Sequence, residues 1–129
     1  MVQSFNYDSL LGIKYKKNGR TIEGLNCLGL VNLIHILQDK EFPIDQLPSE
    51  EELIYKLVIE EQKLFQKIEI PEKDCIVLFK FIPKKFHVGC IMEDTSKFIH
   101  IIENRNVTID SLESPIWKRL LIGYYKWIK

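Results

Sequence analysis

The sequence lacks three features that would assign a chain to a common class at once. Its 129 residues carry no excess of either charge, because 18 lysines and arginines balance 18 aspartates and glutamates. Binding to nucleic acid or to anionic membranes by charge needs a basic surface, so this composition argues against both. No apolar run approaches the roughly 20 residues of a membrane span, and no charged leader precedes an apolar stretch. We expect no nucleic-acid partner, no membrane insertion, and synthesis in the cytoplasm without a signal peptide.

Cysteine is also scarce. The three cysteines are Cys27, Cys75 and Cys90, an odd number at spacings that match no zinc or disulfide framework, so we read them as free thiols. The chain is long enough to bury a core without disulfides or metals. We therefore expect one domain, residues 1–129, without a cofactor.

Helical patterns come first along the chain. Residues 4–12 predict a short helix, and a turn at Asn18-Gly19 predicts a loop or a small hairpin. The stretch "EGLNCLGLVNLIHIL" then predicts a helix that ends at Leu37 and is apolar on nearly every side, so we expect it to be buried all round. Residues 49–68 follow with helical spacing and a capping box of Ser49 and Glu52, which predicts an amphipathic helix.

Strand patterns follow after Pro71. Four short stretches rich in β-branched and aromatic residues are "DCIVLFKFI", "FHVGCIMED", "KFIHIIE" and "NVTID". Their short links predict an antiparallel meander. The end of the chain predicts either a last strand alone or a short turn at residues 115–117 followed by a strand. Helices followed by strands are typical of an α+β domain, and this is the fold class that we expect.

The buried helix begins with a thiol. Asn26 is a good N-cap residue, which places Cys27 at the helix N-terminus. The partial positive charge at this end favours a thiolate, as a nucleophile requires. Free cysteine is also among the most often buried residue types, so a small apolar role is the competing interpretation.

Two histidines lie on neighbouring predicted strands. If the hairpin turns between Glu93 and Asp94, His87 and His100 face each other directly. We expect both on the apolar face that the buried helix covers, where an imidazole could activate the thiol while a second group orients the ring. Two alternatives stay open: hydrogen-bonded core histidines, or a metal site made by these two residues and Cys27.

At this point the sequence resembles a known family. The run "LLGIKYKKNGRTIEGLNCLGLV" resembles the N-terminal motif of the NlpC-type cell-wall cysteine peptidases, which have a papain-like fold, and "HVGCIMEDTSKFIH" resembles their histidine motif. The similarity runs from Leu10 to Ile102. The closing "WKRLLIGYYKW" is similar to the ending of members encoded near phage tail genes.

The resemblance implies a role for each matching residue. Cys27 would be the nucleophile, His87 the general base and then acid, and His100 the group that orients His87. Tyr15 matches a tyrosine that helps to hold the substrate or the oxyanion. The implied reaction is cleavage of an amide through a thioester, with the Cys27 backbone N–H stabilising the oxyanion.

The sequence departs from the family beside the nucleophile. Many members have Asp and Ser where this chain has Asn26 and Leu28, positions associated with gripping the free amine of the stem peptide. The departures bear on specificity more than on cleavage.

Two functions follow from these patterns. The first is a peptidoglycan hydrolase, an endopeptidase acting near the D-glutamyl linkage, carried to the cell wall in a phage tail or a related particle; an amidase or acyl transferase would use the same residues. The second is a weakly active or inactive docking module of a tail assembly. Four aromatic residues would offer it an interface: Trp117, Tyr124, Tyr125 and Trp127.

Overall fold

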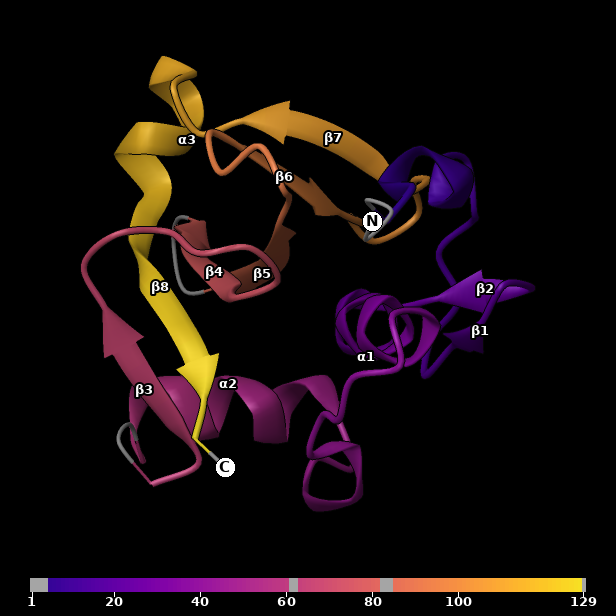
Figure 1. Cartoon of the computed structure of the whole chain (residues 1–129), viewed down its shortest axis with the longest axis horizontal. Helices are drawn as coiled ribbons and strands as arrows, with labels where there is room; N and C mark the ends of the chain where they lie inside the picture. Colours follow the sequence, from indigo (N-terminus) through magenta and orange to yellow (C-terminus); the bar gives the residue numbers. More distant parts are fainter. Residues whose placement is uncertain (1–4, 61–62, 82–84, 129) are drawn as a thin grey trace.

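One antiparallel sheet organises the fold in the computed structural model, which describes residues 5–60, 63–81 and 85–128 (Figure 1). Its strand order is β3-β8-β4-β5-β6-β7. The strands are β3 (Phe65–Ile68), β4 (Ile76–Phe81), β5 (Lys85–Ile91), β6 (Lys97–His100), β7 (Thr108–Ser111) and β8 (Leu121–Trp127). The four strands from β4 to β7 are neighbours in chain order, which confirms the predicted meander. The last strand is confirmed too, and it lies between β3 and β4.

Helices and short elements complete the α+β architecture. The helices are α1 (Cys27–Leu37), α2 (Glu50–Val58) and α3 (Pro115–Leu120), and two 3₁₀ turns are η1 (Tyr7–Leu10) and η2 (Ile44–Gln46). A small hairpin pairs β1 (Arg20–Thr21) with β2 (Gly24–Leu25). No helix among the described residues is long and apolar enough to cross a membrane.

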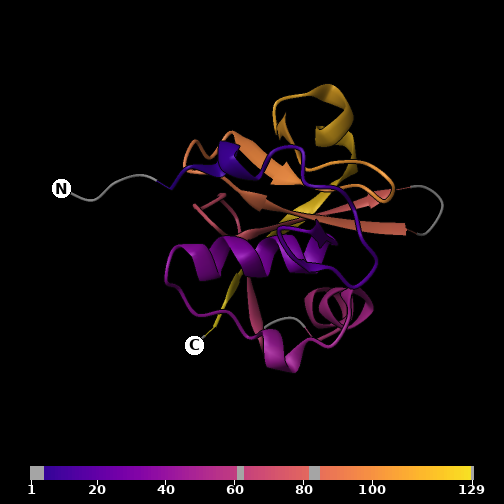
Figure 2. The same cartoon turned by 90° about the vertical axis from the view of Figure 1, so that its right-hand side faces the viewer.

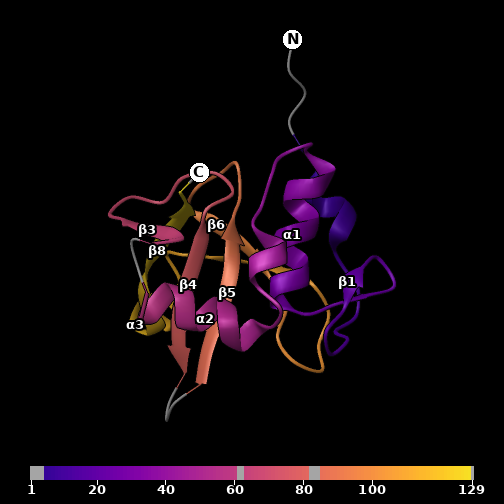
Figure 3. The ribbon, with the colours of Figure 1, turned by 90° about the horizontal axis from the view of Figure 1, so that it is seen from below.

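The two faces of the sheet bury different clusters. Side chains alternate along each strand, so neighbouring residues point to opposite faces. On one face Leu78 and Val88 pack in a cluster with residues of α1, and on the other Phe79 and Phe98 pack against Trp117 of α3. Figure 2 shows α1 and α3 on opposite sides of the sheet, and Figure 3 shows α1 between the sheet and the β1–β2 hairpin.

Helix α1 begins where the sequence predicts. The side-chain oxygen of Asn26 accepts a hydrogen bond of 2.7 Å from the Gly29 backbone N–H, which confirms the N-cap. The helix is buried from Cys27 to Ile34, but Ile36 is 56% exposed and Leu37 50% exposed. The prediction of burial all round is therefore wrong for the last turn.

The second predicted helix is shorter than expected. Helix α2 ends at Val58, and residues 65–68 form β3 rather than a continuation of the helix. Ser49 caps α2 by accepting from the Glu52 N–H at 3.1 Å, as its half of the capping box requires. No proline or glycine separates the two elements in the sequence, and only pairing with distant β8 makes residues 65–68 a strand.

The predicted first hairpin is shifted. A turn does lie at Asn18-Gly19, where the Gly19 N–H donates to the Lys16 carbonyl at 2.8 Å and Asn18 has a φ of 60°. The paired strands come after it, however, and reverse at residues 22–23. The predicted helix over 4–12 is a single 3₁₀ turn, and residue 4 lies outside the described residues.

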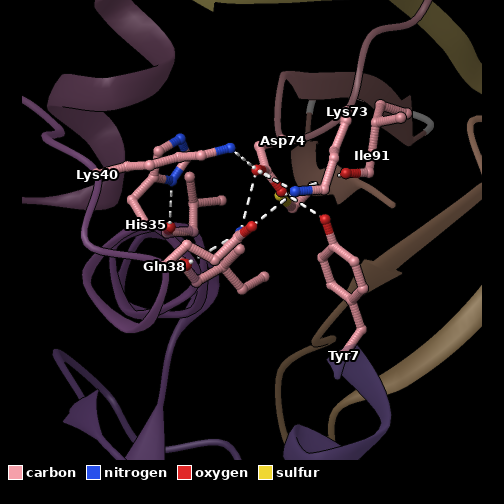
Figure 4. Close-up of polar contacts among 10 residues, drawn as sticks. Tyr7, His35, Gln38, Lys40, Lys73, Asp74 and Ile91 are labelled. Carbon is pink, nitrogen blue, oxygen red and sulfur yellow. Dashed lines mark hydrogen bonds and ion pairs between the residues drawn. The ribbon is translucent and has the colours of Figure 1, made fainter. Parts of the chain in front are cut away.

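The C-terminal end of α1 is held to the sheet by a buried carboxylate (Figure 4). Asp74, just before β4, accepts hydrogen bonds from the Tyr7 hydroxyl and the Lys40 ammonium, both at 2.6 Å, and from the Gln38 amide at 3.0 Å. Its backbone N–H donates to the Ile91 carbonyl at 2.8 Å. Burial would raise the pKa of Asp74, but the Lys40, Tyr7 and Gln38 contacts hold it below its ordinary value. This cluster joins η1, α1 and the start of β4.

Replacing Asp74 with Asn tests this cluster. Asparagine tolerates the positive φ of 67° at this position, so the change removes the charge without a backbone penalty. We expect a loss of about 2 kcal/mol in the free energy of unfolding at pH 7, the order of a hydrogen-bond set to a charged group. Because the folded pKa is below the ordinary 3.8, the contribution is complete at neutral pH, begins to decline below about 3.8, and is lost as the pH falls through the lower folded pKa. Urea unfolding of the wild type and of Asp74→Asn at pH 7 and pH 3 checks this. The same difference in free energy of unfolding at both pH values would contradict it.

Gly29 provides a second test, at the other end of α1. An alanine in the middle of a helix is ordinarily about 1 kcal/mol more stable than glycine. Here the added methyl group would overlap the carbonyl oxygen of Gly19, so we expect Gly29→Ala to lower the free energy of unfolding by about 2 kcal/mol or more. The control is Gly123→Ala, whose methyl group would chiefly meet the flexible end of Lys67. Equal stability of the two variants would show that this contact does not hold the helix in place.

Candidate active site

The N-terminus of α1 carries the predicted nucleophile and an unexpected carboxylate. The Cys27 backbone N–H donates to the Oε1 atom of Glu50, at the start of α2, at 2.8 Å. A negative charge at a helix N-terminus is stabilised by the free N–H groups and the helix dipole. Glu50 thus occupies the N–H donor that the family resemblance implies for a substrate oxyanion.

The same carboxylate acts on the thiol. Cys27 is only 6% exposed, and burial followed by the charge of Glu50 raises the pKa of its thiol well above the ordinary value. The backbones of Val88 and Leu28 lower the pKa by a smaller amount. The prediction of a favoured thiolate is therefore wrong for this arrangement, because desolvation and a neighbouring anion outweigh the helix N-terminus.

A groove of about 560 Å³ opens beside this helix end. Tyr15, Asn26 and Glu50 line it from the helix side, and Lys85 and Glu103 line it from the sheet side. Burial and then the charge of Glu50 raise the pKa of Tyr15. Of the residues predicted to hold the substrate, Tyr15 and Asn26 reach the groove.

Leu28 is placed differently from the prediction. Its side chain has no exposed surface and packs within the core of α1. It cannot contact a substrate in this arrangement, because position 28 lies on the inner side of the helix. The neighbouring Asn26 side chain is engaged as the helix cap.

The two histidines meet, but not as directly opposed residues. The hairpin between β5 and β6 turns over residues 93–96, so that Gly89 pairs with His100 and Ile91 with Phe98. The predicted two-residue turn, and with it the direct His87–His100 pairing, is therefore wrong. The register differs by two residues, which keeps both side chains on the same face. His87 Nε2 and His100 Nδ1 lie 2.8 Å apart across the diagonal.

The face that holds the imidazoles is the second correction. His87 lies on β5 between Phe86 and Val88, which both pack in the α1 cluster, so its own side chain points to the opposite face. There the imidazole contacts Phe81, with ring centroids 5.3 Å apart, and Trp117 at 5.9 Å. The histidines thus lie under α3, not under α1 as expected.

The thiol and the imidazoles are nevertheless close along the chain. Cys27 lies against the main chain of Val88, the residue that follows His87. Among the described residues no hydrogen bond joins the thiol to either imidazole. The structure brings the His87–His100 pair together and places Cys27 beside the same strand on the α1 side.

Both imidazoles are buried, which sets their charge. Burial, with smaller contributions from His100 and Lys85, lowers the pKa of His87 to about 3. Burial also lowers the pKa of His100, although the Asp110 carboxylate opposes it. The pair is therefore neutral at pH 7, and burial makes protonation of either ring unfavourable.

Sequence reasoning missed two residues of this site. Asp110 of β7 accepts at 2.7 Å from His100 Nε2, and Glu50 accepts from the Cys27 N–H. Asp110 lies one strand beyond His100, so extending the strand register through β7 would have found it. No local signal marks Glu50, because its contact depends on how α2 packs against α1.

The remaining histidine and cysteines have the structural roles expected. His35 Nδ1 lies 2.8 Å from the Val31 carbonyl of its own helix. Cys75 and Cys90 are buried, and burial raises the pKa of both thiols, to about 11 for Cys75. Within the described part of the chain no three His, Cys, Asp or Glu residues are placed to hold a metal ion.

Comparison with solved structures places this fold. The chain superposes on a lipoprotein-like NLP/P60 family protein of Staphylococcus aureus with a TM-score of 0.64, 16% identity and 98% of this chain covered. It superposes on an NlpC/P60 family protein of Bacillus cereus with a TM-score of 0.57, 17% identity and 99% covered. The fold is thus that of NlpC/P60 proteins, as the sequence resemblance implies.

The same comparisons set limits on the match. This chain spans only 44% and 42% of those two solved chains. No protein-family model matches the sequence. No curated protein matches it either.

The contact between Glu50 and Cys27 yields a prediction about thiol reactivity. Replacing Glu50 with Gln removes a negative charge beside the thiol, so the pKa of Cys27 falls and the thiolate fraction at pH 7 rises. We expect iodoacetamide to modify Cys27 faster in Glu50→Gln than in the wild type, measured by peptide mass spectrometry. Glu51→Gln, which lines the same groove without a bond to Cys27, is the control. An unchanged rate in Glu50→Gln would show that this carboxylate does not restrain the thiol.

Proposed function

We propose that this protein is a cysteine peptidase that cleaves an amide bond in peptidoglycan stem peptides. One observation carries the proposal. In an NlpC/P60-like fold, a thiol at the N-terminus of the buried helix lies against the main chain of Val88 in β5, and the preceding residue, His87, is hydrogen-bonded to His100 on the other face of the sheet. The groove beside this helix end, lined by Tyr15 and Asn26, has the volume of a site for a small ligand such as a short peptide.

The proposed reaction has two steps. The Cys27 sulfur, its proton taken by His87, attacks the amide carbonyl carbon, and the C–N bond breaks as His87 returns the proton to the leaving amine. Water, with its proton taken by His87, then attacks the thioester, releasing a carboxylic acid and restoring the thiol. His100 orients His87 throughout. For this reaction the imidazole of His87 must reach the thiol, and Glu50 must release the Cys27 N–H to the oxyanion.

We further propose that the bond cut lies near the D-glutamyl linkage and that the domain acts at the cell wall as part of a phage tail or tail-like particle. The support is the similarity of "WKRLLIGYYKW" to the ending of tail-associated members. This stretch forms most of α3 and β8, so it is an integral part of the sheet.

A docking module without peptidase activity is the second candidate. It is favoured by Glu50 on the oxyanion donor, by the raised pKa of Cys27, and by the imidazoles on the α3 face. The aromatic residues predicted to form the interface of a docking module are less exposed than expected, because Tyr125 is buried and Trp117 packs on the histidines.

Muropeptide cleavage distinguishes the two candidates. We expect wild-type protein to release new fragments from purified muropeptides, detected by mass spectrometry, and Cys27→Ala to be at least about 100-fold slower. Cys75→Ala, which removes a buried thiol away from the groove, is the matched control and should keep its activity. No fragments from folded wild-type protein with any stem peptide, including one with a free N-terminal amine, would favour the docking module.

A further inference from the structure

Three polar side chains form a continuous line across the sheet. His87 on β5, His100 on β6 and Asp110 on β7 share the face covered by α3. Each is offset by two residues from the position directly opposite the next, so the contacts are diagonal. The links are 2.8 Å between His87 Nε2 and His100 Nδ1 and 2.7 Å between His100 Nε2 and Asp110 Oδ2.

We propose that Asp110 is a positioning residue, which fixes the proton of His100 on Nε2 and thereby leaves the lone pair of His87 on Nδ1. An effect of Asp110 on catalysis rests on the proposed peptidase function. The proton positions on His100 and His87 do not.

The proton positions follow from the acceptor at the end of the line. An ionised carboxylate only accepts hydrogen bonds, so His100 Nε2 carries a proton and donates it to Asp110. A neutral imidazole has one N–H, which leaves His100 Nδ1 as an acceptor. His87 Nε2 must then carry the proton that is shared with His100, and its Nδ1 keeps a lone pair.

Burial supports the neutral form of this pair. His100 has no exposed surface and His87 is 6% exposed, so a charge on either ring would be poorly solvated. Asp110 itself is 41% exposed, and water can solvate the outer end of the line.

The position of the lone pair matters for chemistry. Among the described residues His87 Nδ1 has no hydrogen-bond partner, and no buried side-chain nitrogen or oxygen there is left unpartnered. The free Nδ1 therefore accounts for part of the residual exposure of His87. An imidazole nitrogen with a lone pair and no partner is the form that accepts a proton from a thiol.

Nitrogen-15 NMR of the histidines tests the proposal without any substrate. In wild-type protein at pH 7 we expect both His87 and His100 as neutral Nε2–H tautomers. In Asp110→Ala the constraint on His100 is lost, and we expect Nδ1–H tautomers of both rings to become populated. Thr108→Ala, on the same strand and opposite His100 in the ladder, is the control and should leave both tautomers unchanged. If Asp110→Ala does not fold, Asp110→Asn, which keeps an acceptor oxygen without the charge, is measured in its place.

The outcomes separate the two proposals. A charged His100, or an Nδ1–H tautomer in the wild type, would overturn the assignment, as would tautomers unaffected by Asp110→Ala. If the tautomers behave as expected but no muropeptide is cleaved, the role of Asp110 stands and the peptidase function fails. In an active protein we expect Asp110→Ala to lower kcat at least about tenfold with little change in KM, with Asp110→Asn restoring part of the loss. If Thr108→Ala lowers kcat and stability as much as Asp110→Ala does, the role of Asp110 is structural only.

Discussion

The burial of α1 against the sheet is the constraint on which the rest of the structure depends. The helix is buried on every side from Cys27 to Ile34, enclosed by the hairpin, by α2 and by β5 together. Each end is then held by a specific contact. Gly29 allows the Gly19 carbonyl to approach the first turn, and the buried carboxylate of Asp74 ties Gln38 and Lys40 beyond the last turn to the start of β4. A helix held at both ends in this way positions Cys27 along β5 without a disulfide or a metal.

Side chains of β5 alternate between the two faces of the sheet, and this separates the thiol from the imidazoles. Val88 must face α1 to complete the core, so His87 faces α3, where Phe81 and Trp117 enclose its ring. The thiol and the imidazole thus approach the same strand from different sides. Hydrogen bonds to His100 and Asp110 give the buried imidazoles the partners that polar groups need in an apolar setting. The line of polar groups therefore allows two histidines to be buried on this face of the sheet.

Local patterns predicted what depends on local interactions. The Asn26 cap, the start of α1, the strands β4 to β7 and the structural role of His35 could be read from the sequence, because caps, turns and period-two patterns act within a few residues. The end of α2 could not, because residues 65–68 become a strand only by pairing with β8, more than 50 residues later. The hairpin between β5 and β6 shows the limit most clearly. Counting from Glu93 and Asp94 placed both histidines on one face of the sheet but in the wrong register, since a turn of four residues replaces one of two.

The candidate site was predicted in its residue types more than in its arrangement. Cys27, His87 and His100 were identified from spacing and resemblance, but whether they meet depends on packing between elements that are distant in sequence. Glu50 could not be predicted for the same reason. Its position follows from the contact between α1 and α2, and no motif around residue 50 distinguishes it from the neighbouring Glu51 and Glu52.

The position of Glu50 also has a physical consequence for any reaction at Cys27. A helix N-terminus offers a limited set of free N–H groups, and a carboxylate, a thiolate and a substrate oxyanion compete for the same positive end. With Glu50 bound at 2.8 Å, that end is already neutralised, and a second negative charge on Cys27 is disfavoured both by repulsion and by burial. A ligand that draws Glu50 away would remove both the repulsion and the competitor in one movement. The same contact that stabilises this end of α1 therefore also disfavours a thiolate at Cys27 in the arrangement described.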